Sequence, residues 1–376
     1  MKKATSKRFA KIASLAFAGA LVLSACGGES TTGGAATTDD TTAAAGAFPT
    51  SGSGELHLYN WTDYISQDLL DRFTAETGIN VILDTFDSNE TLLAKLQAGA
   101  AGYDIIMPSD YMVAQMIELN MLQKLDVASF PNGKNIQPEF MDVYFDSGRH
   151  YTAPYLYGTT GIACNTKLEP ACANIKSWKD LFTGNYEKVN MLKDQVEVVS
   201  SALRAVGVSA ADLCTEDKTK YAAAQELLSG FKPDVIDSDG GNERMITGAS
   251  HIRQGWNGDT HRAKMENADI EFIYPSEGLN FWSDHMAVPV GAPNLDNAKI
   301  FMNWMMDPKN IAEASNYNGY NNSIVGSDAF LDAELTGDPA VIVPAEFTSL
   351  LSPVPNCGEA ARELYTQVFT TWLDEQ

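Results

Sequence analysis

Apolar residues follow two alternating spacings over the first stretch of chain after Glu55. Strand-like runs at 56–60, 80–86 and 103–107 alternate with helical patterns that keep their apolar residues on one face, and Gly78 ends the first of these helices. A further helical pattern runs through Met116 and Ile117. Strands that alternate with helices predict an α/β fold with a mostly parallel sheet and helices on both of its faces.

The alternation continues to the end of the chain. A strand at 159–165 is expected to cross into a second lobe, and a run at 284–289 is expected to cross back. Other helices are predicted at 178–182, 196–205, 221–228, 295–306 and 359–373, and other strands at 189–192, 234–237 and 270–274. The roughly 320 residues from Glu55 onward are too many for one hydrophobic core and favour two lobes.

The first 25 residues have the order of a bacterial lipoprotein signal peptide. Five basic residues precede a short apolar run at 15–23, and Leu23-Ser24-Ala25-Cys26 follows. The apolar run is too short to span a membrane stably. Residues 1–25 are therefore predicted to be removed and Cys26 to be lipidated, which anchors the protein on the extracytoplasmic side of the cell membrane. An ordinary secretory peptide with a chance cysteine is the alternative.

Residues 26–54 are almost all Gly, Ser, Thr, Ala and Asp, and we expect them to form a flexible tether. The net charge of the chain is −23, and cleavage of a peptide with five basic and no acidic residues leaves about −28. This charge argues against nucleic acid and anionic lipid as partners. It would attract cations, although a solvated acidic surface is the simpler explanation.

Four cysteines remain after Cys26. Disulfides form readily outside the cytoplasm, and Cys164 and Cys172 are close enough in sequence to staple one loop. Cys214 and Cys357 could form a second pair, but the sequence does not favour it. The spacing matches no zinc motif, so neither a metal nor any other cofactor is expected.

The turn after the first strand carries candidate chemistry. Two rings, a hydroxyl and a carboxylate crowd into Trp61-Thr62-Asp63-Tyr64, at the carboxyl end of a strand. In open α/β sheets ligands bind at this edge, and rings beside an acid suit an organic cation with an apolar body. The alternative is that Trp61 and Tyr64 belong to the core and that Asp63 caps the next helix.

Several segments together resemble a known family. The order and spacing of these segments are similar to those of the extracytoplasmic spermidine/putrescine-binding proteins of polyamine ABC importers, and the similarity covers nearly all of 56–373. The segments are LYNWTDY (58–64), FTAETGI (73–79), DSNE (87–90), YDIIMPS (103–109), PY (154–155), GTTGI (158–162), GWNGD (255–259), PSEG (275–278) and FWSD (281–284).

The resemblance implies a two-lobed periplasmic-binding-protein fold of type II with a hinged cleft between the lobes. Lobe 1 would comprise 55–158 and 283–328, and lobe 2 would comprise 159–282 and 329–376. It also implies capture of a polyamine, spermidine or putrescine, and delivery to the membrane subunits of an ABC transporter. We expect a monomer.

The resemblance further implies a set of ligand-binding residues. Burying an ammonium group costs several kcal/mol of desolvation free energy unless the group is paired. A cation–π contact with a ring contributes only about 0.5 to 2 kcal/mol, so the acids must offset most of the desolvation. The acid expected to matter most is Asp284. The residues that match the family's site are Trp61, Thr62, Asp63, Tyr64, Ser109, Asp110, Tyr111, Asp194, Glu197, Trp256, Asp259, Trp282, Asp284 and Tyr320.

Three of these acids also have simpler explanations. Asp110 could cap the helix that follows it, and Asp194 with Glu197 could complement the dipole at a helix start. Selectivity is left open, because a glutamine of spermidine-preferring relatives is replaced here by Val354. Three site residues look spermidine-like, namely Tyr111, Asp194 and Trp282, whereas Asp63, Asp259 and Val354 look putrescine-like.

Other functions are disfavoured by what the sequence lacks. It contains no His-Glu-x-x-His, Gly-x-Ser-x-Gly or phosphate-loop motif, so the protein is not expected to be an enzyme. A metal site would require histidines, and a betaine site would contain fewer acids. A site for an amino acid would require an arginine for its carboxylate, and no arginine stands among the matched positions. A binding protein for another organic cation, or a polyamine sensor that feeds no transporter, remains open.

Overall fold

The computed structural model describes residues 48–99 and 102–376. The predicted signal peptide 1–25, the lipidation residue Cys26 and the tether as far as residue 47 lie outside the described residues. The rest of the predicted tether contacts the folded unit. The amide of Gly52 donates to the carbonyl of Thr77 at 2.9 Å, and the ring centroid of Phe48 lies 4.9 Å from that of Phe130.

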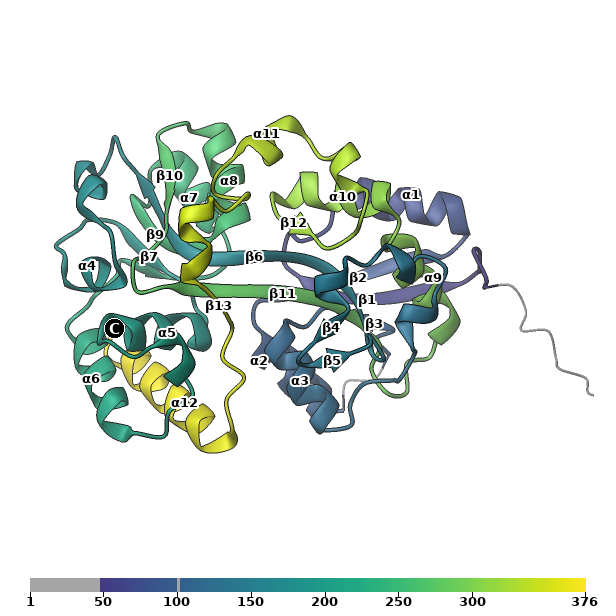
Figure 1. The fold of residues 1–376 in the computed structure, drawn as a ribbon, viewed down its shortest axis with the longest axis horizontal. Coiled ribbons are helices and arrows are strands. Elements are labelled where there is room, and N and C mark those ends of the chain that lie inside the picture. The colour runs from purple at the N-terminus through teal and green to yellow at the C-terminus, as the bar shows by residue number, and fades with distance from the viewer. Residues whose placement is uncertain (1–47, 100–101) are drawn as a thin grey trace, which may run out of the picture. The chain divides into compact units, whose positions relative to one another are not determined.

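The first part of the chain forms the alternating strands and helices that the sequence predicts (Figure 1). β1 pairs in parallel with both β2 and β3. The Ser66 side chain caps the start of α1 by accepting from the amide of Leu69, and Gly78 ends the helix at φ 81°. The elements are β1 (Glu55–Trp61), α1 (Gln67–Thr77), β2 (Asn80–Phe86), α2 (Asn89–Gln97), β3 (Ile105–Ile106) and α3 (Asp110–Glu118).

Two long strands, β6 (Thr152–Asn165) and β11 (Leu279–Ala287), run through the middle of the sheet (Figure 1). The 14 residues of β6 span about 45 Å at 3.3 Å per residue, which is enough to serve both lobes. The strands pair antiparallel, and their register shifts between Ser283 and His285. Parallel pairing is thus found in the flanks of the sheet, and antiparallel pairing at its centre.

The second lobe is built on the far half of β6. Its strands follow the order β6-β9-β7-β8, with β7 parallel to β8 and β9, and β10 pairs with β6. β9, α7 and α8 were not predicted. The elements are α4 (Trp178–Thr183), β7 (Val189–Met191), α5 (Gln195–Ala205), α6 (Lys218–Ser229), β8 (Val235–Ile236), α7 (Gly241–Thr247), β9 (Ile252–Trp256), α8 (Asn257–Glu266) and β10 (Ile270–Ile273).

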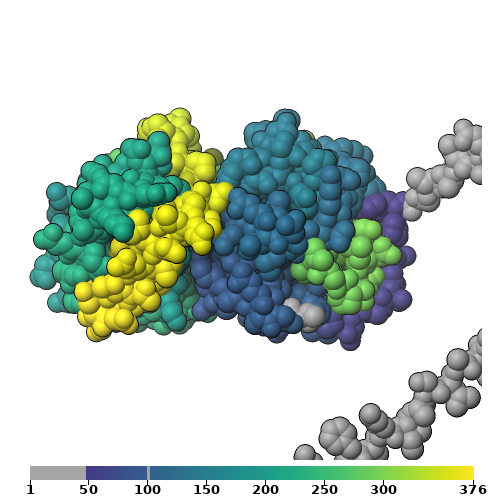
Figure 2. Space-filling model, turned by 90° about the horizontal axis from the view of Figure 1, so that it is seen from below, coloured from purple at the N-terminus to yellow at the C-terminus, as the bar shows by residue number. Residues whose placement is uncertain are grey.

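The remaining segments complete both lobes. The yellow carboxyl-terminal helix α12 packs against α5 and α6 of the second lobe (Figure 2). The remaining helices and strands are β4 (Asp142–Val143), β5 (Asp146–Ser147), α9 (Leu295–Met305), α10 (Pro308–Asn318), β12 (Asn321–Asn322), α11 (Ala333–Gly337), β13 (Leu351–Pro353) and α12 (Glu359–Asp374). Short 3-10 helices lie at Val127–Ser129, Gly133–Asn135, Pro138–Phe140, Pro170–Asn174, Ala210–Asp212, Ser327–Phe330 and Ala345–Leu350.

Two large hydrophobic cores, beside a small cluster that includes Met245 and Ala263, confirm the two-lobed α/β fold. Phe73 and Phe301 are buried in the first core, and Trp178 and Trp372 in the second. The first core draws mostly on 56–156 and 282–324, and the second on 162–279 and 357–372. The exact lobe boundaries stay a prediction. No helix within the described ranges combines the length and the apolar character that a bilayer crossing requires.

Both cysteine pairs are joined in the structure. Cys164 and Cys172 form one disulfide, with their Cα atoms 6.0 Å apart. Cys214 and Cys357 form the other, with a Cα separation of 5.0 Å, and link the segment before α6 to the segment before α12. The second pair, which the sequence left open, therefore closes a loop with a sequence separation of 143.

Candidate functional site

A cavity lies where β6 and β11 pass between the two cores. Its wall includes residues from the ends of β1, β3 and β9 and from the start of α5, which are far apart in the chain. The structure brings all but one of the predicted site residues to this wall, namely Trp61, Thr62, Asp63, Tyr64, Ser109, Tyr111, Asp194, Glu197, Trp256, Asp259, Trp282, Asp284 and Tyr320.

Asp110 is the exception. It is the first residue of α3, and its Oδ1 accepts from the amide of Tyr111 at 2.8 Å. The side chain is buried, and the loss of water raises its pKa well above the ordinary value. The structure thus separates Asp110 from the cavity wall and ties it to the start of its own helix, unlike the site prediction.

Asp284 stands at the irregular point of β11, between Ser283 and His285. A bulge of this kind re-aims a side chain, and here it directs the carboxylate to the cavity. Tyr64 Oη donates to Asp284 Oδ2 at 2.8 Å, and Ser109 Oγ donates to Asp284 Oδ1 at 2.6 Å. Burial raises the pKa of Asp284 to about 7, although both hydrogen bonds oppose the rise.

Asn89 holds the serine that contacts Asp284. Its side chain donates to Ser109 Oγ at 3.1 Å and accepts from the Ser109 amide at 3.1 Å. Asn89 also lines the cavity. It belongs to the DSNE segment (87–90) that resembles the family, but it is not among the predicted site residues.

Asp194 and Glu197 meet at the start of α5. Asp194 Oδ1 caps the helix by accepting from the amides of Val196 and Glu197, both at 2.9 Å, and the residue also lines the cavity. The helix-end explanation and the site prediction therefore describe the same side chain. Asn280 donates to Glu197 Oε2 at 2.9 Å, and burial together with the Asp194 charge raises the pKa of Glu197 to about 8.

Glu90 is an acid beside the site that is not among the predicted site residues. Tyr111 Oη donates to Glu90 Oε1 at 3.3 Å. Burial and the nearby charge of Asp194 raise the pKa of Glu90 to about 7. The only sequence feature that could have indicated Glu90 is its position in the DSNE segment (87–90), which resembles the family.

Aromatic rings form much of the wall between these acids. The ring centroids of Trp61 and Trp256 lie 6.5 Å apart, and those of Trp282 and Tyr320 lie 5.1 Å apart. The close approach of Trp282 requires glycine at 158, because a Cβ there would lie 2.6 Å from the indole ring. Trp61 Nε1 donates to the carbonyl of Met107 at 2.8 Å, which fixes this ring at the rim.

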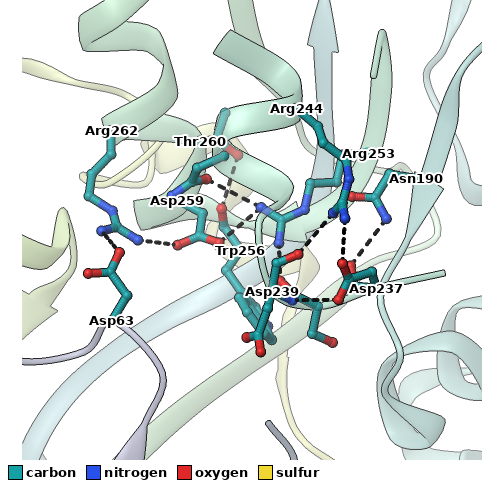
Figure 3. A network of polar contacts seen from close by, with 12 residues as sticks. Asp63, Asn190, Asp237, Asp239, Arg244, Arg253, Trp256, Asp259, Thr260 and Arg262 are labelled. Carbon is teal, nitrogen blue, oxygen red and sulfur yellow. Dashed lines mark hydrogen bonds and ion pairs between the residues drawn. The ribbon is translucent and has the colours of Figure 1, made fainter. Parts of the chain in front are cut away.

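The other two predicted acids already have cationic partners in the protein (Figure 3). Arg262 Nη1 lies 2.6 Å from Asp63 Oδ2, and Arg262 Nη2 lies 2.9 Å from Asp259 Oδ1. Arg253 Nη1 lies 2.9 Å from Asp259 Oδ2. Burial alone would raise the pKa of Asp259, but the two guanidiniums hold it below its ordinary value. No arginine stands among the positions matched to the family's site, but Arg262 lines the cavity.

Four acids contrast with this paired set. Within the part of the chain that the structure describes, Glu90, Asp194, Glu197 and Asp284 form no ion pair with a lysine, arginine or histidine. Carboxylates that lack a counter-ion among aromatic rings can bind an organic cation, which would restore their ionised form. Across residues 48–99 and 102–376, no three His, Cys, Asp or Glu side chains are grouped to hold a metal ion.

Comparison with known proteins gives concordant matches. The model of the family described as bacterial extracellular solute-binding protein matches residues 68–343. The spermidine/putrescine-binding periplasmic protein 1 of Haemophilus influenzae is 35% identical over 319 residues, which cover 84% of this chain and 87% of that protein. The spermidine/putrescine-binding periplasmic protein of Salmonella typhimurium is 34% identical over 304 residues, 80% of this chain and 86% of that one.

A solved structure agrees with the fold. The spermidine/putrescine ABC transporter substrate-binding protein of Streptococcus pneumoniae, solved with calcium and HEPES, superposes with a TM-score of 0.70 at 30% identity. The match covers 86% of this chain and 99% of that one.

Proposed function

Because the chain belongs to the family of bacterial extracellular solute-binding proteins, we propose that it captures a polyamine in the cavity between its lobes and delivers it to an ABC importer. The observation that carries the proposal is the set of three buried carboxylates, Asp194, Glu197 and Asp284, which line the cavity with aromatic rings and have no ion-pair partner. The relatives named for spermidine and putrescine binding support the same ligand class. As a member of this family the protein is a solute-binding protein and not an enzyme.

The energetics favour a ligand with more than one ammonium group. An isolated ionised carboxylate is costly to bury, and so is an unpaired ammonium. When the two meet, each removes the desolvation cost of the other, and a ring face adds roughly 0.5 to 2 kcal/mol. The methylene groups between the ammoniums of a polyamine would lie against the rings of Trp256 and Trp282.

The two groups of acids suggest two positions for ammonium groups. One would meet Asp284, where Tyr64 and Ser109 orient the carboxylate. Another would meet Asp194 and Glu197 at the start of α5. Closure about β6 and β11 would bring the acids of the second lobe toward those of the first, so that the ligand itself favours the closed state.

The cellular setting follows from the first 25 residues and the family. We propose removal of residues 1–25, lipidation at Cys26 and a position outside the cytoplasm, where 26–47 and the residues that follow tether the folded unit. The monomeric protein would dock on the membrane subunits of the importer, and a separate ATPase would drive release.

Isothermal titration calorimetry of the chain that starts at residue 27 tests the function. Putrescine, cadaverine, spermidine and spermine are titrated separately. At least one is expected to bind more tightly than about 100 μM, roughly −5.5 kcal/mol. Lysine and γ-aminobutyrate serve as controls, because they carry an ammonium together with a carboxylate. If all four polyamines bind more weakly than that limit, the proposal is wrong.

A further inference from the structure

Asp63 and Asp259 differ from the other acids of the cavity in their partners. Asp63 follows β1 in the first lobe, and Asp259 lies in the first turn of α8 in the second. Arg262 is one helical turn after Asp259 and contacts both carboxylates, at 2.6 Å and 2.9 Å (Figure 3). The guanidinium of Arg262 therefore bridges Asp63, which is 199 residues away in the chain, and Asp259, which is 3 residues away.

We propose that Arg262 is a built-in cation that occupies the ammonium position formed by Asp63 and Asp259, and so limits how many charges a ligand can bring into the cavity. The inference rests on the proposed function. It assigns these two acids to holding Arg262 and not to binding the ligand, and it makes Arg262 a residue that determines specificity.

The hydrogen bonds support this assignment, because every oxygen of the two carboxylates has a donor from the protein. Asp63 Oδ2 accepts from Arg262, and Asp63 Oδ1 accepts from Tyr317 Oη at 2.6 Å. Asp259 Oδ2 accepts from Arg253 at 2.9 Å. Asp259 Oδ1 accepts from Arg262 at 2.9 Å and from Tyr320 Oη at 3.1 Å. Three of these four oxygens keep a further lone pair, so it is the positive charge of Arg262, and not a lack of acceptors, that opposes a ligand ammonium beside these acids.

The charges support it as well. The carboxylates of Asp63 and Asp259 are balanced by the guanidiniums of Arg253 and Arg262, although Asp87 and Asp239 also line the cavity. Burial would lower the pKa of Arg262, but Asp259 and Asp63 raise it, so the guanidinium stays charged. At the other end of the cavity, burial raises the pKa of Glu197 to about 8 and that of Asp284 to about 7, and neither acid forms an ion pair. An incoming ammonium is therefore favoured at that end.

The two arginines are not equivalent. The Arg253 side chain is 2% exposed, and its Nη2 donates to the carbonyl of Ser238 at 2.9 Å. A Cβ at Gly241 would lie 2.1 Å from the guanidinium carbon of Arg253, so this arginine is packed tightly into the second lobe. The Arg262 side chain is 24% exposed and lines the cavity. Arg262 can therefore be replaced with less effect on the fold.

The test replaces Arg262 and measures how a longer polyamine competes with a shorter one. In Arg262→Ala the two acids are left with one guanidinium and open space, which creates room for an additional ammonium. The spermine-to-putrescine affinity ratio, measured by calorimetry, is expected to rise at least tenfold. Arg262→Lys keeps the charge, and its ratio should stay within threefold of the unmodified protein.

A second variant identifies the acids involved. Asp63→Asn in the Arg262→Ala background removes one of the two freed carboxylates, so most of the gain for spermine should be lost. Circular dichroism melts of each variant check that the fold is retained.

The possible outcomes separate the two proposals. An Arg262→Ala protein that loses affinity for both ligands equally would overturn the inference, because Arg262 would then only hold the lobes together. An unchanged ratio would also overturn it. If the unmodified protein binds no polyamine at all, the proposed function fails and this inference fails with it.

Discussion

Tyr64 and Asp284 are 220 positions apart in the chain, and the hydroxyl of one donates to the carboxylate of the other at 2.8 Å. Ser109, at the start of α3, donates to the second oxygen of the same carboxylate at 2.6 Å. The turn after β1, the start of α3 and the irregular point of β11 thus fix one acid in position. Each oxygen keeps a further lone pair with which to accept from a ligand.

Replacing this acid with its amide tests its role. Asp284→Asn keeps the size of the side chain but removes the charge, so an ammonium that it pairs with is left without compensation. Polyamine affinity, measured by calorimetry, is expected to fall at least tenfold. Tyr64→Phe keeps the carboxylate and should cost less than Asp284→Asn. An unchanged affinity in Asp284→Asn would place the ammonium elsewhere.

Affinity should also rise with pH. Glu90, Glu197 and Asp284 have pKa values raised to about 7, 8 and 7, so part of this set is protonated near neutrality in the free protein. A bound cation favours the ionised form and lowers these pKa values, so binding releases protons and strengthens as pH rises. One group with a pKa of 7 is about one tenth ionised at pH 6 and about nine tenths at pH 8, which corresponds to an affinity gain of about tenfold.

Calorimetry in two buffers with different ionisation enthalpies measures the released protons directly. The control is Asp284→Asn, which should show a shallower pH dependence because one titrating group is gone. An affinity that is flat or falls between pH 6 and 8 would contradict the assignment of these acids to the cation site.

Val354 gives a test of selectivity. It is buried and lines the cavity, and the family resemblance predicts that it stands where spermidine-preferring relatives carry a glutamine. Val354→Gln is expected to raise the spermidine-to-putrescine affinity ratio by about tenfold, because a hydrogen bond to a charged group contributes roughly 1.5 kcal/mol. Val354→Met adds length without a hydrogen bond and serves as the matched control. Equal ratios in both variants would show that the amide at this position does not set selectivity.

The two disulfides should differ in their effect on stability. A cross-link stabilises mainly by restricting the unfolded chain, and the restriction grows with loop length. The sequence separations are 143 for Cys214–Cys357 and 8 for Cys164–Cys172, so the loop-entropy relation gives about 5 and about 2.5 kcal/mol. Urea unfolding of the two double serine variants measures both losses. A larger loss for the Cys164 and Cys172 pair would be contrary to this relation.

The first part of the fold could be predicted because its local signals agree. In β1 the apolar residues Leu56 and Leu58 stand at alternate positions, and both are buried. Ser66 and Gly78 mark the two ends of α1, as their caps require. β9 was missed for a physical reason. Its residues Arg253 and Gln254 are buried but polar, because they pair with Asp259 and with the carbonyl of Glu197, so the run shows no apolar pattern.

The site shows the same limit. The turn that carries Trp61 could be placed because a strand end and a cluster of rings lie next to each other in the chain. The contact between Arg262 and Asp63 could not be predicted from the sequence, because the two residues are 199 positions apart and helix α8, which carries Arg262, was not predicted. Asp110 shows the opposite case, since its sequence neighbours Ser109 and Tyr111 line the cavity while its own Oδ1 accepts from the amide of Tyr111.

The order in which the strands join the sheet has a consequence for synthesis. β3 and the first half of β6 each pair with β11, which is translated more than a hundred residues after β6 ends. Until Leu279 and the residues after it emerge, a nascent chain exposes two unpaired strand edges, which readily pair with other chains. Truncation before β11 should therefore yield aggregates instead of an isolated first lobe.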